Sequence, residues 1–224
     1  MLRRLLPGDF LGDPFDAARN VVLGAVLETN IGGVRTAGLI TEAEVYIGGS
    51  DKASHTYGYR RTERVMSQYE MGGHAYVFLV YGIHAQFCVV LGERDVPNVV
   101  LVRSVMPLWG TDEMLRRRGK IKPDEGISLP GKKAKLDAAL CTGPGNATKA
   151  LGVTTRLNGV DLCASDEIGL YVPAEPETGA GRDISNHAVM PCSDEALRAI
   201  LSARADEMLE YVKTADMSLV DYLG

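Results

Sequence analysis

Two β-rich runs joined by a glycine turn constrain the fold of this chain more than any other feature. Residues 22–29 are rich in branched aliphatic side chains, a turn signal follows at 30–33, and 35–46 resume a strand-like pattern. This arrangement predicts a β-hairpin. Further β-rich runs follow at 75–80, 86–91 and 99–105. Together they predict an α+β fold with a central, mostly antiparallel, curved sheet flanked by helices.

Helical signals are fewer and shorter. A helix is expected after Asp13-Pro14, another at 111–118 ending in Gly119, and a third at 147–151. Residues 194–213 place apolar side chains at helical spacing. A chain of 224 residues with 46% hydrophobic content has enough apolar surface for one core. We therefore expect a single domain at 1–192 and a helical extension at 193–224 packed on it.

Composition excludes several classes of protein. No apolar run reaches the length of a membrane span, and Pro7 interrupts the leader-like N-terminus. The cysteines are widely spaced and the histidines lack metal-ligand spacing, which argues against a zinc site or a disulfide framework. We expect an intracellular protein (cytoplasm or nucleoid if bacterial), a monomer, with no metal and no cofactor.

The formal net charge of −5 argues at first sight against a nucleic-acid partner. The charge is uneven, however. Residues 114–135 carry eight bases and two acids, and Arg60, Arg61 and Arg64 form a second basic cluster. Such clusters are usually solvated surface loops, so by themselves they do not establish DNA binding.

A carboxylate and an aromatic ring share one strand face. Residues i and i+2 of a strand point the same way, so Glu44 and Tyr46 would project together. A base stacked on the ring would lie near the acid, which suits hydrolysis of the bond between a nucleobase and its sugar. Glu42 lies on the same face, so this pattern does not decide which carboxylate acts. By pattern alone, ordinary core packing is the preferred interpretation of the aromatic residues.

Six motifs occur in the order, and at nearly the spacing, found in the alkyladenine (3-methyladenine) DNA glycosylase family. The chain resembles this family over about residues 8–188. The motifs are Glu42-Ala43-Glu44-Val45-Tyr46, Asp51-Lys52-Ala53-Ser54-His55, Arg60-Arg61-Thr62-Glu63-Arg64, Gly73-His74-Ala75-Tyr76-Val77-Phe78-Leu79-Val80-Tyr81-Gly82, Val100-Leu101-Val102-Arg103 and Cys141-Thr142-Gly143-Pro144-Gly145.

The resemblance assigns a role to each candidate residue. It makes Glu44 the general base that activates water, places a flipped base between Tyr46, His55 and Phe78, and makes Tyr81 the wedge that fills the vacated space. Cys88 and Ile184 would also lie near the base. The remaining expected DNA contacts are Gly82, Arg103, Arg60, Arg61, Arg64, Thr142 and Gly143. For Arg103, in the middle of an apolar run, a phosphate is preferred over an acidic partner.

Departures from the family pattern bear on specificity. Phe78 stands where members commonly have Tyr, and Cys88 falls where an Asn is usual. The family ending is absent after about residue 190, so the wall near Ile184 is altered. The resemblance therefore implies excision but leaves the preferred lesion open.

The leading prediction is a monofunctional DNA glycosylase that removes alkylated purines from double-stranded DNA in base excision repair. No lysine is expected beside Glu44 to act as a Schiff-base nucleophile, so strand cleavage is not predicted. Two alternatives are a non-catalytic module that binds damaged DNA and an N-glycosidase that acts on free nucleosides.

Overall fold

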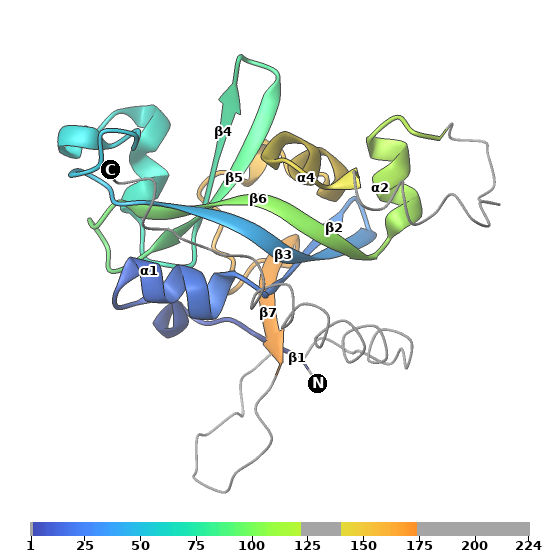
Figure 1. The fold of residues 1–224 in the computed structure, drawn as a ribbon, viewed down its shortest axis with the longest axis horizontal. Coiled ribbons are helices and arrows are strands. Elements are labelled where there is room, and N and C mark those ends of the chain that lie inside the picture. The colour runs from blue at the N-terminus through green and yellow to red at the C-terminus, as the bar shows by residue number, and fades with distance from the viewer. Residues whose placement is uncertain (1, 122–139, 174–224) are drawn as a thin grey trace, which may run out of the picture. The chain divides into compact units, whose positions relative to one another are not determined.

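The computed structural model describes residues 2–121 and 140–173, which fold around one seven-stranded sheet (Figure 1). Its strand order is β1-β7-β2-β3-β6-β5-β4, and every neighbouring pair is antiparallel. The predicted α+β class with an antiparallel sheet is therefore confirmed. The strands are β1 (Leu2–Arg4), β2 (Val26–Ile31), β3 (Val34–Tyr46), β4 (Ala75–Val80), β5 (His84–Leu91), β6 (Asn98–Trp109) and β7 (Ile168–Pro173).

The predicted hairpin is formed by β2 and β3. Gly32 and Gly33 make the two-residue turn, with φ angles of 64° and 79° that glycine adopts without steric cost. The first arm is shifted relative to the prediction, because Val22 ends a π-helical turn and the strand begins only at Val26. The second arm agrees with the prediction to within one residue.

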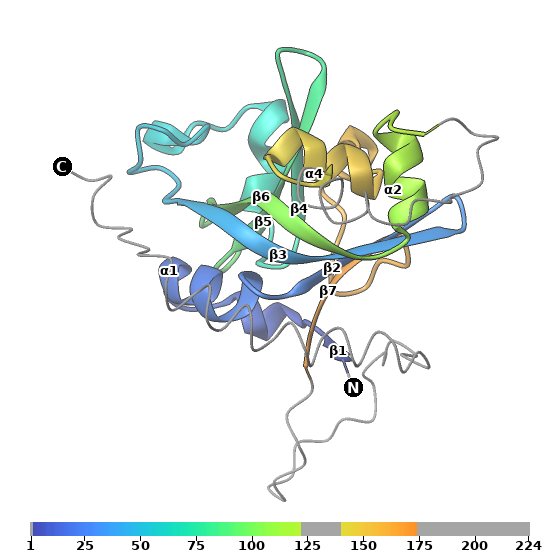
Figure 2. The ribbon, with the colours of Figure 1, turned by 45° about the vertical axis from the view of Figure 1, so that its right-hand side comes forward.

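Three short α-helices lie wholly within the described part of the chain and accompany the sheet. In α1 (Pro14–Ala17) the Asp13 carboxylate caps the first turn, and α2 (Thr111–Arg117) is followed by Gly119 with a φ of 67°. Helix α4 (Pro144–Leu151) begins three residues before the predicted start, because Pro144 takes the first helical position. Figures 1 and 2 show α2 and α4 side by side on one side of the sheet and α1 on the other. Further helical turns are η1 (Pro7–Phe10), η2 (Ala18–Val22), η3 (Tyr57–Tyr59), η4 (Glu63–Tyr69) and η5 (Thr155–Leu157).

The strands β4, β5 and β6 divide their side chains between two buried clusters. Alternate residues belong to the main core, among them Val77, Phe87, Val89, Val100 and Val102. The residues between them form a second cluster, made of Tyr76, Cys88, Val90, Val99 and Leu101, against which Tyr46 and Phe78 pack. Because successive side chains of a strand face opposite ways, the sheet carries its core on one face and this second cluster on the other.

Some expectations fall outside the part of the chain that the structure describes. These are Ile184, the helix at 194–213 and the extension at 193–224. Within the described ranges, no helix has the length and apolarity needed to cross a bilayer.

Candidate active site

A row of directly paired residues crosses four strands of the sheet. Glu44 of β3 pairs with Leu101 of β6, Leu101 with Cys88 of β5, and Cys88 with Tyr76 of β4. Directly opposed residues of neighbouring strands point to the same face. The sheet register therefore aligns one carboxylate with the aromatic and aliphatic side chains of the second cluster.

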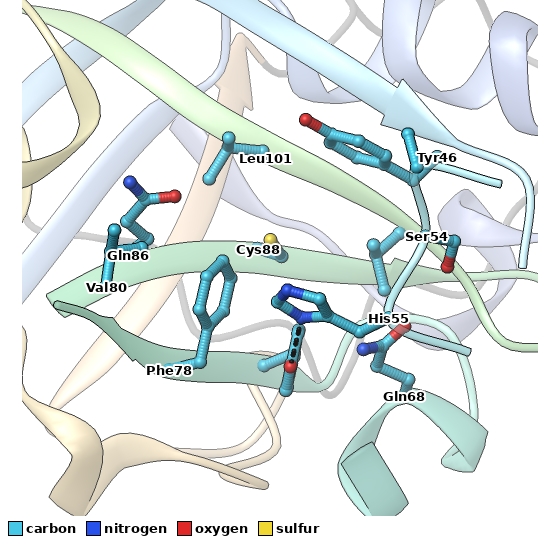
Figure 3. A pocket seen from close by; sticks show the side chains of 12 residues that line it. Tyr46, Ser54, His55, Gln68, Phe78, Val80, Gln86, Cys88 and Leu101 are labelled. Atoms are coloured by element: carbon cyan, nitrogen blue, oxygen red, sulfur yellow. Dashed lines mark hydrogen bonds between the residues drawn. The ribbon is translucent and has the colours of Figure 1, made fainter. Parts of the chain in front are cut away.

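A cavity of about 210 Å³ opens over this row (Figure 3). Figure 3 shows Cys88 on the central strand, with Tyr46 to one side and His55 and Phe78 to the other. The four side chains therefore come together from β3, β4, β5 and the loop after β3. The lining residues are Tyr46, Ala53, Ser54, His55, Gln68, Tyr76, Phe78, Val80, Gln86, Cys88, Val99 and Leu101.

Aromatic contacts fix one wall of the cavity. The His55 ring meets Phe78 edge-on at 4.7 Å between centroids, and Phe78 stacks on Tyr76 at 5.1 Å. His55 Nδ1 and the Tyr76 hydroxyl are 2.8 Å apart. Burial, and to a lesser extent the charge of Arg64, lower the pKa of His55. The lowered pKa favours the neutral imidazole near pH 7, and its Nδ1 shares a hydrogen bond with the Tyr76 hydroxyl.

Both oxygens of the Glu44 carboxylate are hydrogen-bonded. The Tyr46 hydroxyl donates to Oε2 at 2.8 Å, which shows that the two side chains share a face, as predicted. Arg103 Nη1 donates to Oε1 at 3.0 Å. Burial first, and then the hydrogen bond to Glu44, raise the pKa of Tyr46, so the phenol remains a donor. Glu44 lies beside the cavity and is joined to its wall through Tyr46.

Arg103 also contacts the second carboxylate of β3. Its Nε donates to Glu42 Oε1 at 3.1 Å, and the Ser104 hydroxyl donates to Glu42 Oε2 at 2.9 Å. The structure thus gives Arg103 acidic partners, where the sequence analysis preferred a phosphate. A contact between Arg103 and DNA stays a prediction.

Tyr81 and Gly82 form the tip of the β4–β5 hairpin. Both residues have positive φ angles, 51° and 72°, and Tyr81 is 91% exposed. Figures 1 and 2 show this hairpin projecting from the rest of the sheet. A left-handed conformation is unfavourable for a tyrosine. The turn therefore presents the ring to solvent at a cost in backbone energy.

The other three arginines predicted to contact DNA differ in their surroundings. Arg60 is exposed, Arg61 pairs with Asp95 at 2.6 Å and lies 4.0 Å over the Tyr69 ring, and Arg64 donates to the Leu79 carbonyl at 3.4 Å. Their roles toward DNA stay predictions.

Thr142 and Gly143 lie beside β6 at the start of α4. Thr142 forms a β-bridge with Ser104, and the Gly143 amide donates to the Ser104 hydroxyl at 3.2 Å. The Ser104 side chain thus links the Gly143 amide to the Glu42 carboxylate.

Several lining residues were not found from the sequence. Gln68 reaches the cavity from η4, Ser54 from the loop after β3 and Gln86 from β5. Gln68 lies in a segment without strand or helix periodicity, so no sequence signal marked it, and Ser54 belongs to the motif that ends at His55 but was given no role of its own. Burial raises the pKa of the Cys88 thiol, which stays protonated as a neutral part of the cavity floor. Within 2–121 and 140–173, His, Cys, Asp and Glu side chains form no group of three that could hold a metal.

A cavity walled by aromatic rings, with a carboxylate at its edge and an exposed aromatic hairpin nearby, is typical of enzymes that act on nucleobases. The comparison with protein families is more specific. The chain belongs to the methylpurine-DNA glycosylase family, whose model matches residues 9–187.

Individual relatives agree with this assignment. The chain is 40% identical to a protein of Chlamydia abortus over 150 residues, 66% of this chain and 72% of the relative. It is 37% identical to one of Bacillus cytotoxicus over 173 residues, 77% of this chain and 78% of the relative. A Clostridium perfringens protein matches at 40% over 147 residues, 66% of this chain and 69% of the relative. All three are named "Putative 3-methyladenine DNA glycosylase".

Proposed function

We propose that this protein is a monofunctional DNA glycosylase that swings an alkylated purine out of duplex DNA and hydrolyses its N-glycosidic bond with Glu44 as general base. The observation that carries the proposal is the hydrogen bond from the Tyr46 hydroxyl to Glu44 at 2.8 Å. It joins a ring of the cavity wall to a carboxylate, so a base stacked on Tyr46 brings its sugar close to the acid.

Glu44 is better placed than Glu42 for this role. Glu44 contacts Tyr46, which lines the cavity, whereas Glu42 contacts Ser104, outside the lining set. Each carboxylate oxygen has two lone pairs, so Glu44 retains acceptor capacity for a water molecule beside its two present donors. That water would attack the anomeric carbon as its proton passes to Glu44.

The cavity suits a cationic, planar leaving group. Tyr46, Phe78 and the neutral His55 offer flat faces, and the cavity floor is formed by uncharged side chains such as Cys88 and Leu101. N-alkylation gives the purine a positive charge, so it stacks well on electron-rich rings and leaves without prior protonation. One carboxylate is then sufficient for the chemistry.

The hairpin tip supports action on duplex DNA. Tyr81 is almost fully exposed on a projecting turn, and a flat side chain there can occupy the gap left by an extruded base. An enzyme for free nucleosides has no use for such a wedge. The lining set of the cavity, drawn from the described residues, includes no lysine, which supports hydrolysis without a Schiff-base step.

Incubation with duplexes that each carry one defined lesion, followed by chromatography of the released bases, tests the proposal. We expect free methylated purine and an intact strand that breaks only after alkali treatment. Tight binding of the duplexes without any release would favour the non-catalytic alternative. Release from free nucleosides but not from duplexes would favour the nucleoside enzyme.

A further inference from the structure

The proposed mechanism gives no task to Glu42, although its carboxylate is as fully engaged as that of Glu44. One guanidinium, that of Arg103, bridges the two acids, with Nε 3.1 Å from Glu42 and Nη1 3.0 Å from Glu44. The other oxygen of Glu42 accepts the Ser104 hydroxyl at 2.9 Å. Glu42 is thus in a position to act on Glu44 through Arg103.

Arg103 lies outside the regular pairing of β3 and β6. In the β3–β6 register Glu42 pairs with Ser104 and Ala43 with Val102, so Arg103 is the extra residue of a β-bulge. A bulge re-aims a side chain and leaves its residue outside the regular pairing. The Arg103 side chain is also 34% exposed, so its orientation depends on the groups it contacts.

The guanidinium geometry makes the contact with Glu42 informative. The group is planar and its donors form a rigid fork, so a partner on Nε determines where Nη1 points. With Nε held by Glu42, Nη1 meets Glu44. Without that partner, the long side chain would sample other rotamers and spend less time against Glu44.

Glu42 is in turn held from the direction of α4. Ser104 donates its hydroxyl to Glu42 and accepts the Gly143 amide at 3.2 Å. An unbroken set of hydrogen bonds therefore runs from the loop before α4 to the Glu44 carboxylate. Its members are Gly143, Ser104, Glu42, Arg103 and Glu44.

We propose that Glu42 is a positioning residue, which holds the Arg103 guanidinium against Glu44 and so keeps that carboxylate oriented for water attack. This inference rests on the proposed function, because it assigns Glu42 a part in the excision step. It does not require Glu42 to touch the substrate.

A double-mutant cycle of Glu42→Gln and Arg103→Met tests the inference. Excision is measured in single turnover with enzyme in saturating excess, so that weaker DNA binding does not enter the rate. If Glu42 acts through Arg103, Glu42→Gln slows excision roughly tenfold in the wild-type background and less than about twofold in the Arg103→Met background. Ser104→Ala, which removes one support of Glu42, should slow excision by a smaller factor.

The outcomes separate this inference from the proposed function. An equal slowing by Glu42→Gln in both backgrounds, or none in either, overturns the positioning role. If Glu44→Gln leaves excision intact, the proposed function itself fails. The Glu42 side chain is 53% exposed, so Glu42→Gln should fold normally. Glu167→Gln, which breaks the exposed ion pair with Arg156, is the control for folding. The melting temperature of Glu42→Gln should match that of this control.

Discussion

The Tyr46 hydroxyl lies 2.8 Å from Glu44 Oε2 and donates a hydrogen bond to it. A side chain that forms the wall of the cavity therefore also contacts the carboxylate at its edge. This relationship connects base stacking with water activation in the proposed reaction, and the two contributions can be separated by substitution.

Tyr46→Phe keeps the ring and removes the hydroxyl. Hydrogen bonds to charged groups are the stronger kind, so we expect single-turnover excision to fall about tenfold. Affinity for lesion-containing duplex should stay the same, because stacking is retained. Tyr57→Phe, at an exposed tyrosine outside the cavity lining, is the matched control and should behave as wild type. Equal rates for both variants would show that the hydroxyl has no part in excision.

Tyr81→Ala removes the ring at the hairpin tip. Extruding a base costs a few kcal/mol of lost stacking, which the ring offsets in duplex DNA but not in single strands. We therefore expect excision from duplex to fall about tenfold or more and excision from single strands to fall much less. Val34→Ala, at the exposed end of the β2–β3 hairpin, should change neither rate. Equal losses of Tyr81→Ala on both substrates would remove the wedge role.

Tyr76 should make the folded state sensitive to alkaline pH. Its side chain is 1% exposed, and burial raises the pKa of Tyr76 to about 12. A phenol with a raised folded-state pKa contributes stability that is complete below its unfolded value of about 10 and is lost as pH rises toward 12. Tyr76→Phe lacks this group, so its free energy of unfolding should decline less steeply between pH 10 and 12. Parallel urea-unfolding curves for both proteins across that range would contradict the assignment.

Arg4 should contribute to stability without affecting excision. It is 7% exposed and donates to the carbonyls of Leu162, Ser165 and Ile168. Arg4→Met leaves these acceptors unpaired, and we expect the free energy of unfolding to fall by about 3 kcal/mol. Excision per folded molecule should be unchanged at a temperature well below the melting point. A stability loss below about 1 kcal/mol would show that water replaces the guanidinium.

The sequence was most informative where structure is local. Alternation and glycine turns predicted β3 and the adjacent hairpin, because both depend on residues close together in the chain. Strands β1 and β7 were not predicted. Leu2–Arg4 is a strand only through its pairing with Tyr171, Val172 and Pro173, which the local pattern of three residues does not contain.

The same distinction holds within the candidate site. Glu44 and Tyr46 share a face because they are two residues apart on one strand. Which of Glu42 and Glu44 contacts the cavity wall depends on the β3–β6 register and its bulges, which sequence spacing does not specify. Gln68 enters the cavity from η4, and only the path of the connecting loop brings it there.

Glu44→Gln removes the proposed general base. The substitution keeps the size and shape of the side chain and one of its two acceptor oxygens, but removes its ability to accept a proton from water. Single-turnover release of methylated purine from duplex should fall by about 10²–10⁴-fold, while binding of the lesion duplex and the melting temperature stay close to wild type. Glu167→Gln should excise at the wild-type rate. Release by Glu44→Gln at the wild-type rate would show that Glu44 is not the general base.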